Sequence, residues 1–117
     1  MQISKRKVNP GLERQLFKML FQLVADVKTA QEAEEVLKNL LSETELATVV
    51  KRLAVAYWLT RGRSYGNIKE NLKVSSATIA DVQQNLKRPG WKLAVKKVMA
   101  DEWATVWEER IKKIIKR

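Results

Sequence analysis

The sequence predicts an all-α protein built of several short helices. Apolar residues recur at intervals of three and four positions through nearly the whole chain, which is the period of a helix with one buried face. No segment shows the alternation of apolar and polar residues that is typical of a half-buried strand. The 117-residue chain has only four glycines and two prolines, and they stand between the apolar segments, where helices begin and end.

The first helix is expected over about residues 12–27, directly after Pro10-Gly11. Its apolar stripe consists of Leu12, Leu16, Leu20, Leu23 and Val27. We expect residues 1–11 to form a flexible basic arm. A hydrophobic content of 45% is enough for one core, so residues 12–117 are expected to form a single domain.

Two capping boxes predict the next two helices. Thr29 stands three residues before Glu32, the spacing at which both side chains bond the free backbone N–H groups of a helix start. That helix is expected to end near Leu41. Ser42 is followed three residues later by another glutamate, which predicts a third helix that runs to about Thr60.

Residues 61–88 predict two short helices joined by a tight turn, with a helix-turn-helix over about 64–87. Ser64 can cap the first helix, and Ser75 or Ser76 the second. The apolar positions have the spacing by which two crossed helices share a small core: Ile68, Leu72, Val74, Ile79, Val82 and Leu86. A further helical pattern, broken once, is expected over 91–116.

The second helix of this pair has the surface that a DNA-reading helix needs. Its other positions are small or form hydrogen bonds, which suits a helix in the major groove: Ser75, Ser76, Ala77, Thr78, Ala80, Gln83 and Gln84. Any helical hairpin in an all-α protein shows similar spacing, so the pattern is also compatible with a purely structural hairpin.

The charge distribution favours the DNA-reading interpretation. Residues 61–97 contain nine basic and two acidic side chains, an excess of +7, whereas residues 26–45 contain two basic and six acidic ones, an excess of −4. The whole chain carries a formal charge of +10 and has a pI near 10.0. A polyanionic partner, most simply double-stranded DNA, fits this balance.

The composition excludes several other classes. The chain has no cysteine and no histidine, which removes zinc fingers, thiolate nucleophiles, histidine acid–base catalysis and the commonest metal sites. We expect no enzyme, metal or cofactor, because the remaining carboxylates stand at capping and helix-surface positions: Glu43, Glu45, Asp101, Glu102, Glu108 and Glu109. No membrane span or signal peptide is recognisable, so we expect a cytoplasmic protein.

Apolar stripes flank the hairpin on both sides and predict a homodimer. A chain of this length cannot easily cover them alone, whereas a second copy can. The basic C-terminal stretch, residues 109–117, continues an apolar stripe that includes Trp103 and Trp107, so packing is favoured there over DNA or membrane contact.

An ordered set of short motifs lies between Leu40 and Lys87. The motifs are Leu40-Leu41-Ser42, Arg52-Leu53, Arg61-Gly62 and Ala77-Thr78-Ile79. In this order they resemble the core of the tryptophan repressor superfamily over about 48 residues. The resemblance implies an all-helical, intertwined homodimer that binds operator DNA and represses transcription.

The resemblance also identifies a possible effector site at Arg52, Asp81 and Asn85. In the member that senses tryptophan, the ligand is held by one arginine from the central helix and one from the reading helix. Arg52 matches the first, Asp81 stands in place of the second, and Asn85 replaces a nearby serine. Because a ligand carboxylate would be repelled by Asp81, we expect that tryptophan is not the corepressor. Arg52 and Asp81 could pair with each other, or Arg52 could be a surface arginine without any ligand role.

The expected DNA contacts lie on and around the helix-turn-helix. Ser76, Ala77 and Ala80 are expected to face the groove, with Thr78 and Gln83 beside them and Ser75 at the helix start. Phosphate contacts are expected from basic residues around the motif, namely Lys69, Lys73, Lys87 and Arg88, with Arg61 and Arg63 as further candidates. Lys73 takes the turn position where glycine is usual, so a left-handed or near-bridge conformation is expected for this lysine. Lys69 stands at the position where a helix-turn-helix usually has a small residue that lets its two helices approach each other.

Three interpretations remain. The first is a sequence-specific homodimeric regulator, and the second is a helical module that binds nucleic acid or another partner without operator specificity. The third, an enzyme, has little support in the sequence.

Overall fold

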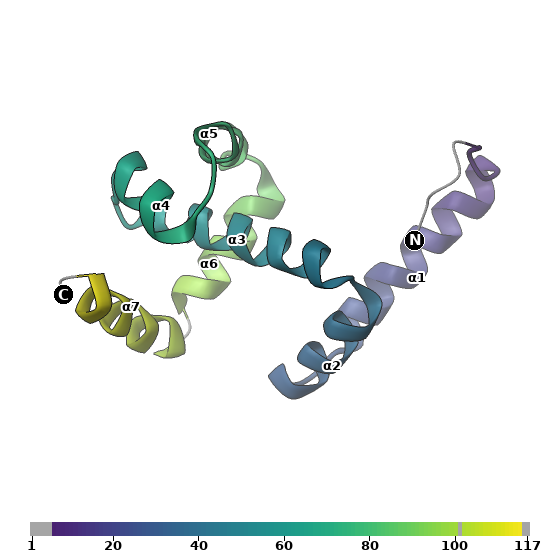
Figure 1. Ribbon diagram of the computed structural model, residues 1–117. Helices are drawn as coiled ribbons and strands as arrows, with labels where there is room; N and C mark the ends of the chain where they lie inside the picture. Colours follow the sequence, from purple (N-terminus) through teal and green to yellow (C-terminus); the bar gives the residue numbers. More distant parts are fainter. Residues whose placement is uncertain (1–5, 101, 116–117) are drawn as a thin grey trace. The chain divides into compact units, whose positions relative to one another are not determined.

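The structure is a computed structural model that describes residues 6–100 and 102–115. Over these residues it contains seven α-helices and no strand, which confirms the all-α prediction (Figure 1). Contacts along the chain group into two compact units, Met1–Ser42 and Glu43–Arg117. The division after Ser42 was not expected from the sequence, and the single domain over 12–117 stays a prediction.

The first unit contains α1 (Pro10–Asp26) and α2 (Ala30–Leu40). Helix α1 begins two residues earlier than predicted, because the Asn9 side chain accepts a 2.8 Å hydrogen bond from the Gly11 N–H and caps the helix. Pro10 then takes the first helical position, where its missing N–H is not needed. Residues 10 and 11 of the expected arm therefore belong to α1, whereas residues 1–5 of that arm lie outside the described residues.

The predicted cap of α2 is confirmed. Thr29 Oγ1 accepts a hydrogen bond from the Glu32 N–H at 3.1 Å. The reciprocal bond differs from an ideal capping box, because Glu32 Oε1 accepts from the N–H of Lys28, one residue before the cap, at 3.0 Å.

The helices of the first unit contain no buried residue. Eight large apolar side chains of α1 are exposed: Leu12, Leu16, Phe17, Met19, Leu20, Phe21, Leu23 and Val24. The four leucines of the predicted stripe are therefore on α1 and exposed in the single chain, whereas Val27 follows the helix as its C-cap residue and is half-buried.

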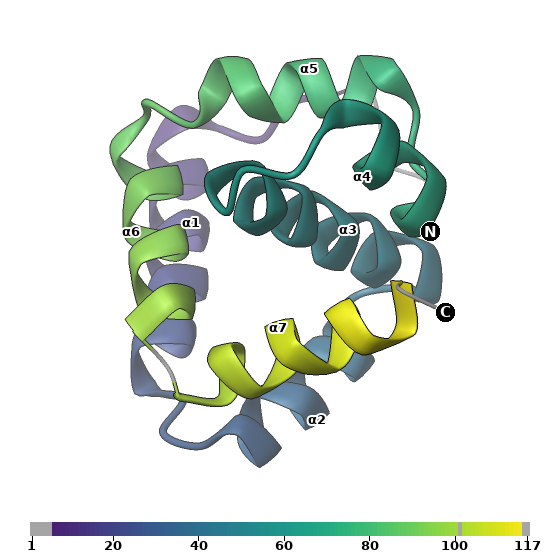
Figure 2. The ribbon, with the colours of Figure 1, turned by 90° about the vertical axis from the view of Figure 1, so that its left-hand side faces the viewer.

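The second unit is built around α3 (Glu43–Thr60). Helix α3 contacts three later helices: α4 (Tyr65–Leu72), α5 (Ser76–Asn85) and α6 (Pro89–Ala100). Helix α7 (Glu102–Ile115) contacts α6. Figures 1 and 2 show α5 and α7 on opposite sides of α3. In the described residues, the helical pattern predicted over 91–116 corresponds to these two helices, α6 and α7, and residues 101 and 116 lie outside the described residues.

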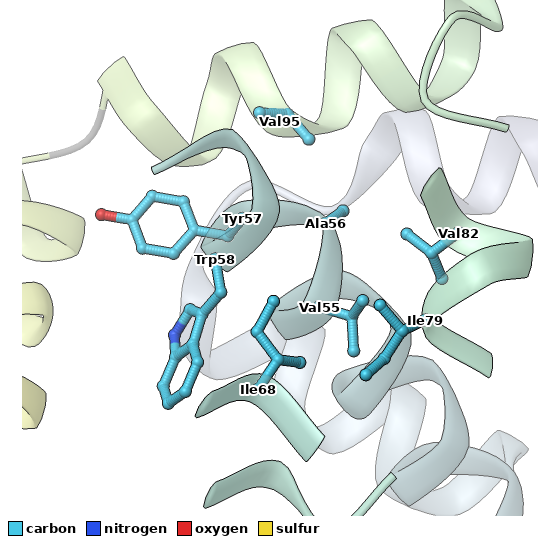
Figure 3. Packing of buried hydrophobic residues seen from close by; sticks show 8 residues of the cluster. All are labelled: Val55, Ala56, Tyr57, Trp58, Ile68, Ile79, Val82 and Val95. Carbon is cyan, nitrogen blue, oxygen red and sulfur yellow. The ribbon is translucent and has the colours of Figure 1, made fainter. Parts of the chain in front are cut away.

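The core of the second unit forms where α3, α4 and α5 meet. Val55 of α3 lies between Ile68 of α4 and Ile79 of α5, and all three are fully buried (Figure 3). Val82 of α5 is also fully buried, and Val95 brings α6 into the cluster. The apolar positions that predicted the helical hairpin therefore attach it to the central helix.

Candidate nucleic-acid interface

Two serine caps define the helix-turn-helix formed by α4 and α5. Ser64 Oγ accepts a 3.1 Å hydrogen bond from the Asn67 N–H at the start of α4. Ser75 Oγ accepts a bond of the same length from the Thr78 N–H at the start of α5. Both caps are as predicted, and Ser76 is therefore the first residue of α5 and not its cap.

The turn between α4 and α5 depends on a left-handed lysine. Lys73 has φ 55° and ψ 50°, a conformation that residues with a side chain rarely adopt. Its carbonyl oxygen accepts a 3.3 Å hydrogen bond from Nζ of Lys51 on α3. The conformation expected for Lys73 is confirmed, and the contact from α3 supports it.

Helix α5 has one buried and one exposed face. Ile79 and Val82 point into the core. The residues expected to face a DNA groove are exposed, namely Ser76, Ala77, Ala80 and Gln83. Thr78 is half-buried and its hydroxyl lies 3.0 Å from that of Ser75, so it belongs to the helix start. The exposed face is slim and polar, as a helix that enters the major groove must be.

Exposed basic residues lie on the segments next to α5 in the chain. Lys69 is on α4, Lys73 is in the turn, and Lys87 and Arg88 follow the end of α5; all four are exposed. Arg61 is exposed as well.

Arg63 differs from these residues because its side chain is committed to contacts within the protein. Its Nη2 lies 3.0 Å from Glu108 Oε1, and only 13% and 4% of the two side chains are exposed. The expectation that Arg63 reaches phosphates is therefore wrong in this structure, and Glu108 is not a solvated carboxylate. The reason is local, since Gly62 has φ 83° and the Arg63 N–H bonds the carbonyl of Trp58 at 3.1 Å, which turns the chain back over α3.

The residues of the possible effector site come together between α3 and α5. Arg52 Nη2 lies 3.3 Å from Asp81 Oδ2, and the Asn85 amide donates to Asp81 Oδ1 at 3.3 Å. The Arg52 guanidinium also lies 5.6 Å from the ring centroid of Trp91 on α6. Pairing of Arg52 with Asp81, one of the two arrangements considered from the sequence, is the one observed.

Arg52 lines two shallow grooves. One, of about 610 Å³, lies beside Arg88 and Trp91, and the other, of about 490 Å³, lies beside Asp81 and Lys73. The Arg52–Asp81 ion pair is therefore accessible from the surface, in agreement with side-chain exposures of 42% and 59%.

Comparison with known protein families identifies the chain. A family model described as Trp repressor protein matches residues 15–99, which is more than half of the sequence. The chain belongs to the Trp repressor family. No curated protein and no solved structure gave a significant match.

The family assignment confirms the resemblance found in residues 40–87 and extends it in both directions. Trp repressor proteins are regulatory DNA-binding proteins with a helical helix-turn-helix fold, and α4 and α5 lie within the matched segment. The possible effector residues also lie within it. Helix α7 lies beyond it, so the Arg63–Glu108 contact joins the family segment to a helix outside the match.

That contact is what sequence reasoning missed. Arg63 and Glu108 are 45 positions apart, and no periodicity or motif connects them. The only available signal was the position of Glu108 on the helix, one turn before Ile111, which is partly buried against the core.

In residues 6–100 and 102–115, no helix is both long enough and apolar enough to cross a membrane. In the same residues, no three or more aspartate or glutamate side chains come together in a group that could hold a metal ion.

Proposed function

We propose that this member of the Trp repressor family is a transcription regulator that binds operator DNA as a homodimer, most simply as a repressor. The observation that carries the proposal is the exposed face of α5, which is small and polar and is flanked by exposed basic residues. The protein is expected to act in the cytoplasm.

In this proposal the groups around α5 divide into two roles. Ser76, Ala77 and Ala80 face base edges in the major groove, with Gln83 at the margin. Phosphates are held by Lys69, Lys73, Lys87 and Arg88, which position the helix without reading sequence. Ser75 and Thr78 serve mainly to start the helix.

A homodimer is supported by the uncovered apolar surface. Helices α1 and α2 have no buried residue, and α1 alone exposes eight large apolar side chains. A patch of that extent on a soluble protein is typical of an interaction surface. A two-fold dimer also presents two reading helices one turn of DNA apart, about 34 Å.

Tryptophan is not expected to act as corepressor. The space between α3 and α5 that a carboxylate ligand would enter contains the Asp81 carboxylate, already paired with Arg52. The ion pair gives α3 and α5 a direct connection that needs no ligand. Any other small-molecule effector stays unidentified.

The proposal is tested by selection of bound duplexes from a random-sequence pool, together with a mass measurement of the free protein. A palindromic motif and a dimer mass are the expected results. Strong, salt-dependent binding without any enriched sequence would instead support a non-specific nucleic-acid-binding module. A monomer without duplex binding would refute the proposal.

A further inference from the structure

Arg63 connects three helices of the second unit. Its guanidinium lies 4.4 Å from the ring centroid of Trp58 on α3, and its Nη1 donates a 3.3 Å hydrogen bond to Oδ1 of Asn67 on α4. Its Nη2 bonds Glu108 on α7 at 3.0 Å. One side chain in the α3–α4 turn therefore holds all three helices.

The ion pair between Arg63 and Glu108 is buried, so each of the two charges needs the other as its partner. Salt and water screen a buried pair far less than an exposed one, and loss of either partner leaves an uncompensated charge inside the protein. The Arg52–Asp81 pair is different, because 42% and 59% of its two side chains are exposed to solvent. Arg63 is thus fixed in place by Glu108.

Asn67 is the point at which this arrangement reaches the helix-turn-helix. Its N–H is bound by the Ser64 cap and its side-chain oxygen by Arg63, so the first turn of α4 is held from two directions. The next residue, Ile68, is fully buried and belongs to the core cluster that includes Ile79 of α5. A shift in the first turn of α4 would therefore be transmitted to α5 by direct packing.

We propose that Arg63 and Glu108 are positioning residues for DNA binding. Helix α7 fixes Arg63 through Glu108, Arg63 fixes the first turn of α4 through Asn67, and α4 orients the reading helix α5. Helix α7 and the helix α5 that it orients lie on opposite sides of α3 (Figure 2). The inference rests on the proposed function, because its readout is DNA affinity, and it assigns a role to a helix outside the family match.

The test compares Glu108→Gln with Glu109→Gln, a neighbour on α7 with an exposed side chain. Both variants remove one negative charge from nearly the same place, so their long-range effects on DNA affinity are matched. We expect Glu108→Gln to bind the selected duplex about tenfold more weakly than Glu109→Gln, within the range found for coupled residues that do not touch the ligand. The slope of log affinity against log salt should be equal in both, because no phosphate contact is lost. Equal affinities would overturn the inference.

Amide exchange in the free protein tests the same step without DNA. The Ile68 N–H bonds the Ser64 carbonyl at 3.0 Å in the first turn of α4. In Glu108→Gln it should exchange about tenfold faster than in Glu109→Gln, while the Val82 amide in the middle of α5 keeps its protection, since local opening need not involve global unfolding. Unchanged exchange at Ile68 would refute the inference, whatever the DNA measurements show. Loss of DNA binding in the original chain and in all variants would instead refute the proposed function.

The double variant Arg63→Met with Glu108→Gln is a control for the case that Glu108→Gln alone does not fold. It carries neither buried charge and has the net charge of the original chain, so far-UV circular dichroism should show a folded protein. Because it lacks the Arg63–Asn67 bond, it should also bind the duplex about tenfold more weakly than the original chain. Original affinity in this folded variant would show that the pair does not position α4.

Discussion

The guanidinium of Arg52 on the central helix lies 3.3 Å from the carboxylate of Asp81 on the reading helix. Side chains therefore join α3 and α5 here. In a tryptophan-sensing relative, the ligand is expected to join the corresponding two helices. Asn85 donates to Asp81 from the next turn of α5, which further orients the carboxylate.

L-tryptophan should not stabilise this protein. Its carboxylate would be repelled by Asp81, and its entry would require the Arg52–Asp81 pair to separate. A thermal-shift titration into the millimolar range should show no saturable increase in melting temperature. The Asp81→Asn variant provides the control, because it removes the repulsion and leaves Arg52 in place. Saturable stabilisation of the original protein would contradict the prediction.

Removal of two basic groups at the end of α5 should weaken binding to all duplexes alike. Lys87→Ala with Arg88→Ala deletes two proposed phosphate contacts, so the slope of log affinity against log salt should become shallower by about 0.9 per contact. Lys112→Ala with Lys113→Ala removes the same charge from α7, on the other side of α3. That control should leave the slope nearly unchanged, and equal slopes in both variants would count against the assignment.

A larger side chain at Ala80 should block DNA binding without harming the fold. Ala80 is exposed on the face of α5 opposite the core, and leucine is nearly as good a helix former as alanine. Ala80→Leu should therefore unfold at nearly the original denaturant concentration and bind the selected duplex at least about tenfold more weakly, through steric exclusion from the groove. Ala100→Leu, at the exposed end of α6, is the matched substitution and should bind normally.

Two lysine-to-glycine substitutions should change stability in opposite directions. Lys73 is left-handed, so Lys73→Gly relieves a steric cost and should raise the free energy of unfolding by about 0.5–1 kcal/mol. Lys69 lies inside α4, so Lys69→Gly should lower the free energy of unfolding by about 1 kcal/mol. Urea denaturation of both variants measures this, and destabilisation by Lys73→Gly would mean that the turn is not left-handed in solution.

The fold could be predicted to the extent that its signals are local. The caps Thr29, Ser64 and Ser75 act within three residues of sequence, and each was found where the spacing predicts it. The buried face of α5 follows from helical period alone, and so does its exposed face. The left-handed Lys73 could be expected because the helix-turn-helix fixes the conformation of its turn.

Two features differ from the prediction, one for a local and one for a long-range reason. The start of α1 lies two residues before the predicted one because the neighbouring Asn9 side chain caps the helix. Arg63 was grouped with solvent-facing basic residues, since its charge is visible in a sequence but its burial against Trp58 and Glu108 is not. Tertiary packing decides which arginine can meet a phosphate.

The uncovered face of α1 has a consequence for cells that contain more than one version of this chain. Because α1 and α2 contain no buried residue, they cannot be held together by a core of their own, so in the proposed homodimer their folding and the joining of two chains become one event. Chains with damaged reading helices would still exchange into such pairs. Each mixed pair would then hold only half of the two-fold DNA-binding surface, and a defective copy would act dominantly over an intact one.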